Sequence, residues 1–347
     1  MIVKAPKPRV VLIYGGRNIE HQLSRATAET VLRHLDRDRY EVTQIYITPD
    51  GEWVTGPDGE LLGIEPAFGV VESIAAAMPA LVRADVAMPM LHGRYGEDGS
   101  LQGLLAMAGT PFVGSDVFAS AAAMDREFTR KLLTAEGIPV AHGVVLRDPA
   151  RELGPAERDV VGLPAFVRPA RGRSGVGFSR IEGWNELPAA VATARQVDSK
   201  VLVEAALPGR RIDVAVLEQP DGRLVTGAPW EITAGQAQFD RTAECPLPPL
   251  DPDVTQMLST TAVEVFRLLG SAGLLQVGFV VNRDPPASWQ LTVNEVNTMP
   301  ALAIASQFPT MWQAAGIPYA KLVDTLLSTA MITNATRSRP RSTTPRP

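Results

Sequence analysis

The stretch Asn294-Glu295-Val296-Asn297-Thr298-Met299-Pro300 places two oxygen-bearing side chains directly after an apolar run. Residues 290–293 read as the end of a strand, so Glu295 and Asn297 are expected to project from the same side of it. Two hard oxygen ligands on one face suit Mg²⁺ held against phosphate. Because such a short motif recurs by chance, a polar strand end in solvent is the alternative. The rest of the chain decides between these interpretations.

The bulk properties favour a multidomain protein that acts on a small molecule. The chain has 347 residues, a net charge of -5, 45% hydrophobic and 20% charged residues. That length predicts two or three domains, and the negative net charge does not indicate nucleic-acid binding. The single cysteine excludes an internal disulfide. With no long apolar span and no signal-peptide pattern, we expect a cytoplasmic protein with no membrane partner.

The first third of the chain predicts an α/β unit with a parallel sheet. Apolar runs at 10–14, 42–47 and 86–91 alternate with a helical pattern that starts at Ser24 and ends near 35. Glu20 follows the first strand and His92 follows the third, so both fall at the carboxyl ends of strands, where ligands bind in such sheets. A solvated loop carboxylate and a satisfied core histidine are the alternatives.

The remainder predicts two further units and a tail. A helix at 119–136, a loop rich in Gly, Ser and Arg around Ser174, and short strands form a small α+β unit. That loop is interpreted either as a phosphate cradle or as a surface turn. A strand-rich region with helices at 254–269 and 311–331 follows Pro208-Gly209. The predicted domains are 1–117, 118–207 and 208–333, with a disordered tail at 334–347.

Several short blocks follow one another in a fixed order along residues 9–332. They are Gly15-Gly16-Arg17 with Glu20-His21, Leu91-His92-Gly93 with Gly96-Glu97-Asp98-Gly99, Val113-Gly114-Ser115, Ala123-Met124-Asp125, Leu202-Val203-Glu204, the opening stretch, and Phe308-Pro309-Thr310-Met311-Trp312. On these blocks the chain resembles the D-alanine–D-alanine ligases of the ATP-grasp superfamily. The resemblance implies a three-domain ATP-grasp architecture, mixed α/β and α+β, with a Rossmann-like N-terminal domain and ATP held between the central and C-terminal domains.

The resemblance also implies a reaction and its residues. In this family ATP phosphorylates the carboxylate of one D-alanine, and the amine of a second attacks the acyl phosphate, with Mg²⁺ neutralising the phosphoryl group. The ligand would be a small amino acid or dipeptide, the cofactors ATP and Mg²⁺, and the assembly a homodimer. By position, the predicted site comprises Glu20, His92, Ser174 and Gln276 for catalysis, Arg126, Arg168, Glu204, Leu207 and Arg211 for the nucleotide, and Glu295 and Asn297 for the metal.

This chain departs from the family pattern on the nucleotide side. Arg126 and Arg168 stand where the family has phosphate-binding lysines, and Arg211 stands where a glutamate accepts the ribose hydroxyls. Gln276-Val277-Gly278 replaces Arg-x-Asp, whose arginine stabilises developing charge and whose aspartate binds metal. Loss of one such donor costs about 10²- to 10³-fold in rate. The lid loop, at 233–244, is shorter and has neither the family's lysine nor its tyrosine.

Two functions therefore follow from the sequence. The main reading is a ligase-derived protein that keeps the first amino-acid subsite but is impaired in ADP-forming ligation, either as a pseudoenzyme or with ATP-independent chemistry on an amino acid. The alternative is an active ATP-dependent D-alanine–D-alanine or related dipeptide ligase, which would serve peptidoglycan precursor or peptide synthesis. The sequence leaves both open, and with them whether the chain is an enzyme.

Overall fold

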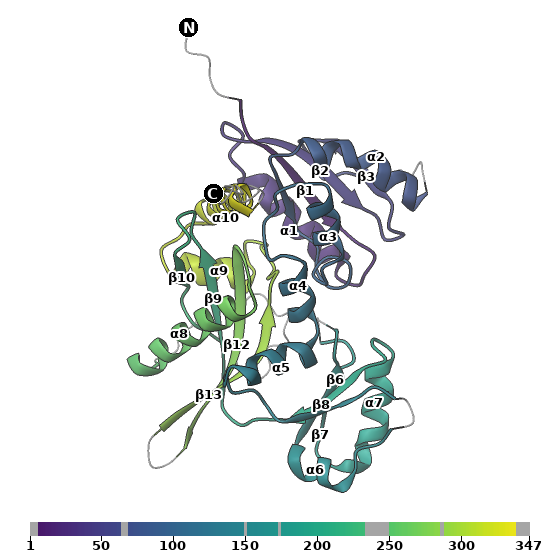
Figure 1. Cartoon of the computed structure of the whole chain (residues 1–347), viewed down its shortest axis with the longest axis vertical. Coiled ribbons are helices and arrows are strands. Elements are labelled where there is room, and N and C mark those ends of the chain that lie inside the picture. Colours follow the sequence, from purple (N-terminus) through teal and green to yellow (C-terminus); the bar gives the residue numbers. More distant parts are fainter. Residues whose placement is uncertain are drawn as a thin grey trace, which may run out of the picture.

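The computed structural model describes residues 6–63, 69–148, 151–172, 175–232, 250–284 and 288–337. These residues form three β-sheets, stacked along the long axis of the molecule with helices around and between them (Figure 1). Within the described ranges, no helix combines the length and apolar character that crossing a bilayer requires.

The N-terminal sheet is a mostly parallel sheet with the order β3-β2-β1-β4. Strand β1 runs parallel to β2 and to β4, and only β3 is antiparallel. Helix α1 covers one face, and α2 and α3 cover the other. The elements are β1 (Arg9–Gly15), α1 (His21–His34), β2 (Glu41–Ile47), β3 (Trp53–Pro57), α2 (Val70–Arg83), β4 (Val86–Pro89) and α3 (Ser100–Met107). The predicted α/β opening is therefore confirmed.

The central sheet is antiparallel, with the order β5-β8-β6-β7. Helix α7 buries its apolar stripe against this sheet, and α4 and α5 connect it to the N-terminal part (Figure 1). The elements are α4 (Val117–Met124), α5 (Arg126–Ala135), β5 (Gly143–Leu146), α6 (Pro155–Val161), β6 (Ala165–Pro169), β7 (Ser179–Ile181), the 3₁₀ turn η1 (Trp184–Glu186), α7 (Leu187–Arg195) and β8 (Val201–Ala205).

The C-terminal sheet is antiparallel and has the order β10-β9-β12-β13, with β11 paired to β9. One face packs on α8 and the other packs partly on α9. The elements are β9 (Arg210–Glu218), β10 (Leu224–Thr226), β11 (Trp230–Ile232), α8 (Pro252–Leu268), β12 (Leu274–Asp284), β13 (Ser288–Asn297), α9 (Gln307–Ala314) and α10 (Tyr319–Arg337).

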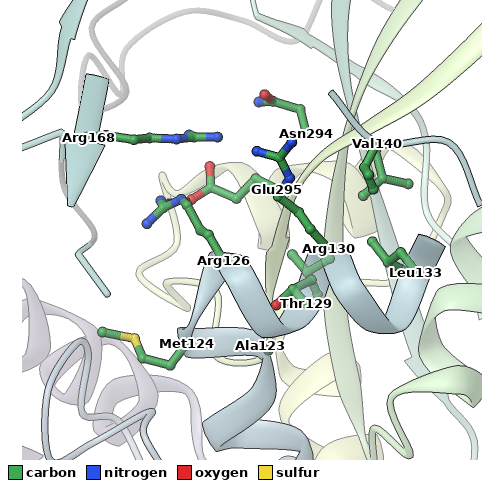
Figure 2. Close-up of a pocket in the computed structure, with 12 residues that line it drawn as sticks. Ala123, Met124, Arg126, Thr129, Arg130, Leu133, Val140, Arg168, Asn294 and Glu295 are labelled. Atoms are coloured by element: carbon green, nitrogen blue, oxygen red, sulfur yellow. Dashed lines mark hydrogen bonds and ion pairs between the residues drawn. The ribbon is translucent and has the colours of Figure 1, made fainter. Parts of the chain in front are cut away.

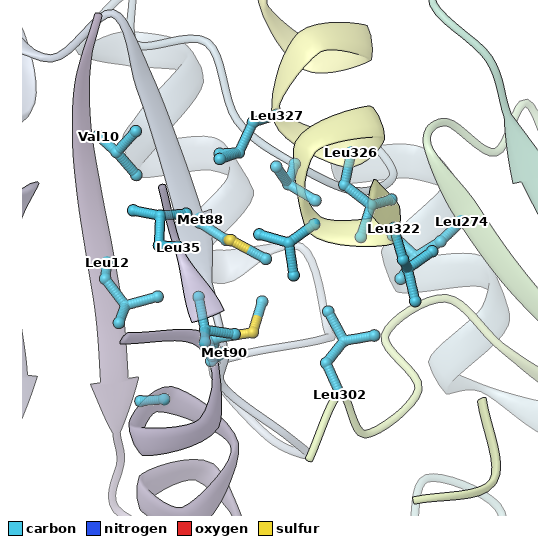
Figure 3. Packing of buried hydrophobic residues seen from close by; sticks show 14 of the residues in the cluster. Val10, Leu12, Leu35, Met88, Met90, Leu274, Leu302, Leu322, Leu326 and Leu327 are labelled. Atoms are coloured by element: carbon cyan, nitrogen blue, oxygen red, sulfur yellow. The ribbon is translucent and has the colours of Figure 1, made fainter. Parts of the chain in front are cut away.

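A single hydrophobic cluster joins the N-terminal sheet to the C-terminal one. It contains Leu12 from β1, Leu274 from β12 and Leu326 from α10, all 1% exposed or less. Figure 3 shows Leu322 and Leu326 between the methionines of the N-terminal sheet and Leu274. Helix α10 therefore packs in a hydrophobic core that the N-terminal and C-terminal sheets share.

Strand β13 contains a β-bulge that sets the direction of the opening stretch. Gly278 of β12 pairs with Glu295, but Phe279 pairs with Val293, so Asn294 is the extra residue. Leu291 and Val293 are buried on one face of the sheet, and after the bulge Val296 takes over that face. Because side chains alternate along a strand, this phase change turns Glu295 and Asn297 to the opposite face. The prediction that they share a side is confirmed, although the bulge itself was not predicted.

Several predicted boundaries were wrong for local reasons. The helix expected at 119–136 is two helices, because Asp125 has a β-type backbone and its carboxylate accepts hydrogen bonds from Glu127 N and Phe128 N as the N-cap of α5. The helix expected at 311–331 divides before Pro318, after Gly316 with φ +84°. Strand β3 and helix α6 were not predicted.

Two further predictions need correction at the ends of elements. Ser24 is not an N-cap: it lies inside α1, accepts a hydrogen bond from Gly15 N (2.8 Å) and donates to Met90 O. It thus ties the ends of β1 and β4 to one helix. The tail expected from 334 onward is helical as far as Arg337, and residues 338–347 lie outside the described residues.

Candidate active site

The first candidate site lies where β1 and β4 end. Gly15 has φ +98°, and a Cβ there would lie 2.0 Å from the carbonyl oxygen of Ile47, so only glycine fits the turn. Glu20 immediately precedes α1. A Cβ built on Gly93 would lie 2.5 Å from Oε2 of Glu20, and Asn18 Nδ2 donates to the carbonyl oxygen of His92 (2.6 Å). The structure therefore brings Glu20 and His92 together, as predicted.

His92 is buried, and one of its ring nitrogens has no hydrogen-bond partner among the described residues. Its side chain is 5% exposed, and Nδ1 lies 3.7 Å from Oε1 of Glu97. Glu97 in turn accepts a hydrogen bond from Gly93 N (3.0 Å), which fixes the carboxylate. Among the described residues Nε2 of His92 has no hydrogen-bond partner. Since buried polar atoms are usually satisfied, Nε2 is suited to a polar ligand atom.

The second candidate site is the polar face of the C-terminal sheet. Gly278 pairs with Asp213 of β9 on one side and with Glu295 of β13 on the other, so the three lie in a row across the sheet. Asn297 lies two residues beyond Glu295, and its Oδ1 accepts a hydrogen bond from Met299 N (2.9 Å). The described residues contain no group of three His, Cys, Asp or Glu side chains placed to hold a metal. A metal here would therefore need the amide oxygen of Asn297 as well as carboxylates.

Asp213 is buried on this face and is held by two amides. Gln276 Nε2 and Gln307 Nε2 each donate to its Oδ2 at 2.8 Å. Burial raises the pKa of Asp213 to about 6, and the negative charge of Glu295 acts in the same direction, while the two amide hydrogen bonds lower it. Gln276 therefore contacts a buried carboxylate, and the catalytic role predicted for it stays a prediction.

Three arginines and Glu295 line a pocket between α5, β6 and β13, and Glu204 pairs with two of these arginines. Arg126 Nη2 donates to Oε1 of Glu295 (2.8 Å), and Figure 2 shows Arg126 and Arg168 approaching Glu295 from two sides. Glu204 forms ion pairs with Arg168 and, at 2.8 Å, with Arg130. Each predicted phosphate-binding cation is thus neutralised by a carboxylate. A polyphosphate entering this pocket would compete with Glu295 and Glu204 for the guanidinium groups.

Family models match both ends of this chain. The model described as D-ala D-ala ligase N-terminus matches residues 9–115, and the one described as D-ala D-ala ligase C-terminus matches residues 132–328. A D-alanine–D-alanine ligase of Mycolicibacterium smegmatis is 42% identical over 362 aligned positions, which cover 94% of this chain and 96% of that relative. The chain belongs to the D-alanine–D-alanine ligase family.

Solved structures support the same family and its ATP-grasp fold. The D-alanine–D-alanine ligase of Coxiella burnetii superposes with a TM-score of 0.80 at 28% identity, covering 96% of each chain. The VanG D-Ala:D-Ser ligase of Enterococcus faecalis superposes with a TM-score of 0.78 at 25% identity, covering 94% of this chain and all of that one. The predicted fold class and family are therefore confirmed. The comparisons support an active ligase better than the main reading of the sequence, an impaired one.

The remaining predicted residues lie as follows. Leu207 follows β8, and Arg211 lies on β9 with its side chain exposed. Ser174 and the lid segment 233–244 lie outside the described residues, so their predicted roles stay predictions. The same holds for the assignment of nucleotide and metal roles to the residues above.

Three side chains of this site were not singled out in the sequence. Arg130 lies one helical turn after Arg126, and this i,i+4 spacing was a usable signal for a shared face. Asp213 interrupts the apolar strand around Ile212 and Val214, which also marks it as unusual. Gln307 carries no signal, because its contact with Asp213 depends on how α9 packs over the sheet.

Proposed function

We propose that this protein is an ATP-dependent ligase that joins D-alanine to a second small D-amino acid. Net, two amino acids and ATP would give a dipeptide, ADP and phosphate. The observation that carries the proposal is the position of Glu20 beside the His92-Gly93 turn, where the buried Nε2 of His92 has no hydrogen-bond partner among the described residues. Membership of the ligase family over nearly the whole chain supports the same activity.

The chemistry of these residues suits an amino acid. The carboxylate of Glu20 would hold an ammonium group, and Nε2 of His92 would hold a polar atom of the same ligand. Glu97 would keep the imidazole in place, because it is itself tied to Gly93 N. Arg126 and Arg168 would bind phosphate oxygens once these displace Glu295 and Glu204. Bound Mg²⁺ would neutralise charge on the transferred phosphoryl group.

The second candidate is a ligase-derived protein that binds an amino acid without turning over ATP. It is favoured by Gly278, which offers no ligand, and by Gln276, which offers an amide where the family has an arginine. The family comparisons favour the first candidate.

Coupled assays separate the two. The chain would be incubated with Mg²⁺, ATP and D-alanine, and ADP, phosphate and dipeptide would be measured, with D-serine as a competing second substrate. Dipeptide formed in step with ADP would establish the first candidate. Calorimetric binding of D-alanine with no ADP would establish the second. Glu20→Gln should weaken D-alanine binding at least about 10-fold by removing the charge partner, whereas Glu41→Gln, at an exposed position of β2, should not.

A further inference from the structure

The space that a side chain at position 278 would fill is taken by a residue of the neighbouring strand. A Cβ built on Gly278 would lie 2.8 Å from Oδ1 of Asp213 and 3.6 Å from Cβ of Glu295. The family resemblance places a metal-binding aspartate at this position of β12. Here a carboxylate reaches the same point from β9, directly across the strand pair.

Asp213 is buried, although the charge of Arg211, an exposed side chain two residues earlier on β9, lowers its pKa. It is 9% exposed, and its neighbours Ile212 and Val214 face the opposite, apolar side of the sheet. Both hydrogen bonds to its carboxylate end on Oδ2, and no described lysine or arginine forms an ion pair with it. Buried carboxylates are ordinarily paired with a cation or bound to a metal.

The two amides fix the direction of the carboxylate. Gln276 and Gln307 hold Oδ2 from β12 and from the start of α9, and they also hydrogen-bond to each other at 3.1 Å. With Oδ2 held from these two sides, Oδ1 faces Gly278 and the strand that carries Glu295. A side chain at 278 would therefore require the carboxylate of Asp213 to move from this position.

We propose that Asp213 is the missing metal ligand of this chain, transferred from β12 to β9, and that Gly278 makes room for it. Oδ1 of Asp213, the carboxylate of Glu295 and the amide oxygen of Asn297 form an all-oxygen set suited to Mg²⁺. Gln276 and Gln307 act as positioning residues for Asp213. The inference rests on the proposed function, because that function supplies the Mg²⁺–nucleotide.

The test measures metal binding separately from turnover. Mn²⁺ bound in the presence of ADP is counted by electron paramagnetic resonance, for the wild-type chain, Asp213→Asn and Glu218→Gln. Asp213→Asn should weaken Mn²⁺ binding by about 10- to 100-fold, with ADP binding in the absence of metal unchanged. Glu218→Gln removes a carboxylate from the far end of the same strand and should bind Mn²⁺ as the wild type does.

An exchange of positions makes the test sharper. Gly278→Asp alone should lose Mn²⁺ affinity, because its Cβ collides with Asp213. Asp213→Thr with Gly278→Asp should bind Mn²⁺ at least about 10-fold more tightly than Asp213→Thr alone, since it returns the carboxylate to β12. Wild-type Mn²⁺ affinity in Asp213→Asn overturns the proposal. The proposal is also overturned if the double variant melts cooperatively but binds Mn²⁺ no more tightly than Asp213→Thr. It is overturned as well if the wild-type chain binds no Mn²⁺ in the presence of ADP.

Failure of the inference differs from failure of the proposed function. If the wild-type chain makes dipeptide and Asp213→Asn keeps wild-type Mn²⁺ affinity, only the ligand assignment is wrong. If the wild-type chain makes no dipeptide but binds Mn²⁺ with ADP, and Asp213→Asn loses that binding, the ligand assignment stands and the proposed ligase activity is wrong.

Discussion

Two glycines in this protein leave space that a carboxylate from another element occupies. Gly93, with φ +70°, leaves room for Oε2 of Glu20, just as Gly278 leaves room for Oδ1 of Asp213. In both places the absence of a Cβ lets a carboxylate from another element approach the backbone. Glycine here acts through space as well as through its backbone freedom.

Gly93→Ala tests this at the proposed amino-acid site. The new Cβ would lie 2.5 Å from Oε2 of Glu20, a flexible side-chain end that can move away, so the chain should fold while Glu20 is displaced. We expect the Kd for D-alanine, measured by calorimetry, to rise at least about 10-fold. Gly109→Ala, at a φ of +68° and with no atom within 4 Å of the new Cβ, is the matched control for the strain of a left-handed alanine. Unchanged D-alanine affinity in a folded Gly93→Ala chain would refute the role of Glu20.

At the scale of elements, the start of α5 and the bulge of β13 place the polar groups of the pocket between α5, β6 and β13. Asp125 caps α5, and Arg126 is therefore the first residue of that helix, directed at Glu295. Next to it, Glu127 is 5% exposed and accepts a hydrogen bond from Lys200 (3.1 Å), one residue before β8. This buried pair holds the helix start against the central sheet.

The Glu127 cluster predicts a loss of stability in acid. Burial alone would raise the pKa of Glu127, but hydrogen bonds and charges from Lys131, Lys200 and Arg147 lower it to about 2. The folded state thus favours the ionised carboxylate, so this contribution is complete above the ordinary pKa of about 4.5 and is lost as the pH falls toward 2.

Urea unfolding of the wild type and Glu127→Gln at several pH values measures this contribution. Near pH 7 the wild type should be more stable by about 1–3 kcal/mol, and the difference should shrink between pH 4.5 and 2. Glu29→Gln, on the outside of α1, controls for a general loss of charge. A difference that stays constant over this range would show that Glu127 is not held ionised.

The bulge gives a second prediction at this scale. Deleting Asn294 would restore simple alternation along β13, so Glu295 and Asn297 would turn toward the face that holds Leu291 and Val293. Burying these polar groups should lower the melting temperature and abolish Mn²⁺–ADP binding. Asn294→Ala keeps the residue count and should retain both properties. A deletion variant with the melting temperature and Mn²⁺ binding of the wild type would show that the bulge does not determine the side of the sheet on which Glu295 and Asn297 lie.

The whole molecule is held together by a cluster that its first and last elements share. Leu12, Leu274 and Leu326 belong to one hydrophobic core although they lie far apart in the sequence (Figure 3). Because helix α10 packs against both sheets, the N-terminal and C-terminal parts should unfold together.

Leu326→Ala tests this coupling by calorimetry. Leu326 is fully buried, so truncation should cost about 2–5 kcal/mol in the free energy of unfolding. The wild type and the variant should each show the two terminal sheets melting in one transition. Met107→Ala, at a position 88% exposed, should leave the melting temperature unchanged. Two separated transitions in the wild-type chain would contradict a shared core.

The sequence by itself determined the family, the α/β opening and most strands of the three sheets. These follow from apolar periodicity and from short blocks such as Leu91-His92-Gly93, which are local and can be read directly. The proximity of Glu20 and His92 was also predictable, because the carboxyl ends of parallel strands meet at one edge of a sheet.

Only the tertiary structure decided the chemistry of the second site. Asp213 adjoins Gly278 because of the antiparallel register between β9 and β12, and Glu295 faces them because of the bulge at Asn294. Both are set by pairing between residues distant in the chain, which no local pattern encodes. In the sequence alone, Gly278 is a position without the metal-binding side chain of the family. In the folded sheet, Gly278 adjoins the carboxylate of Asp213 on the neighbouring strand β9.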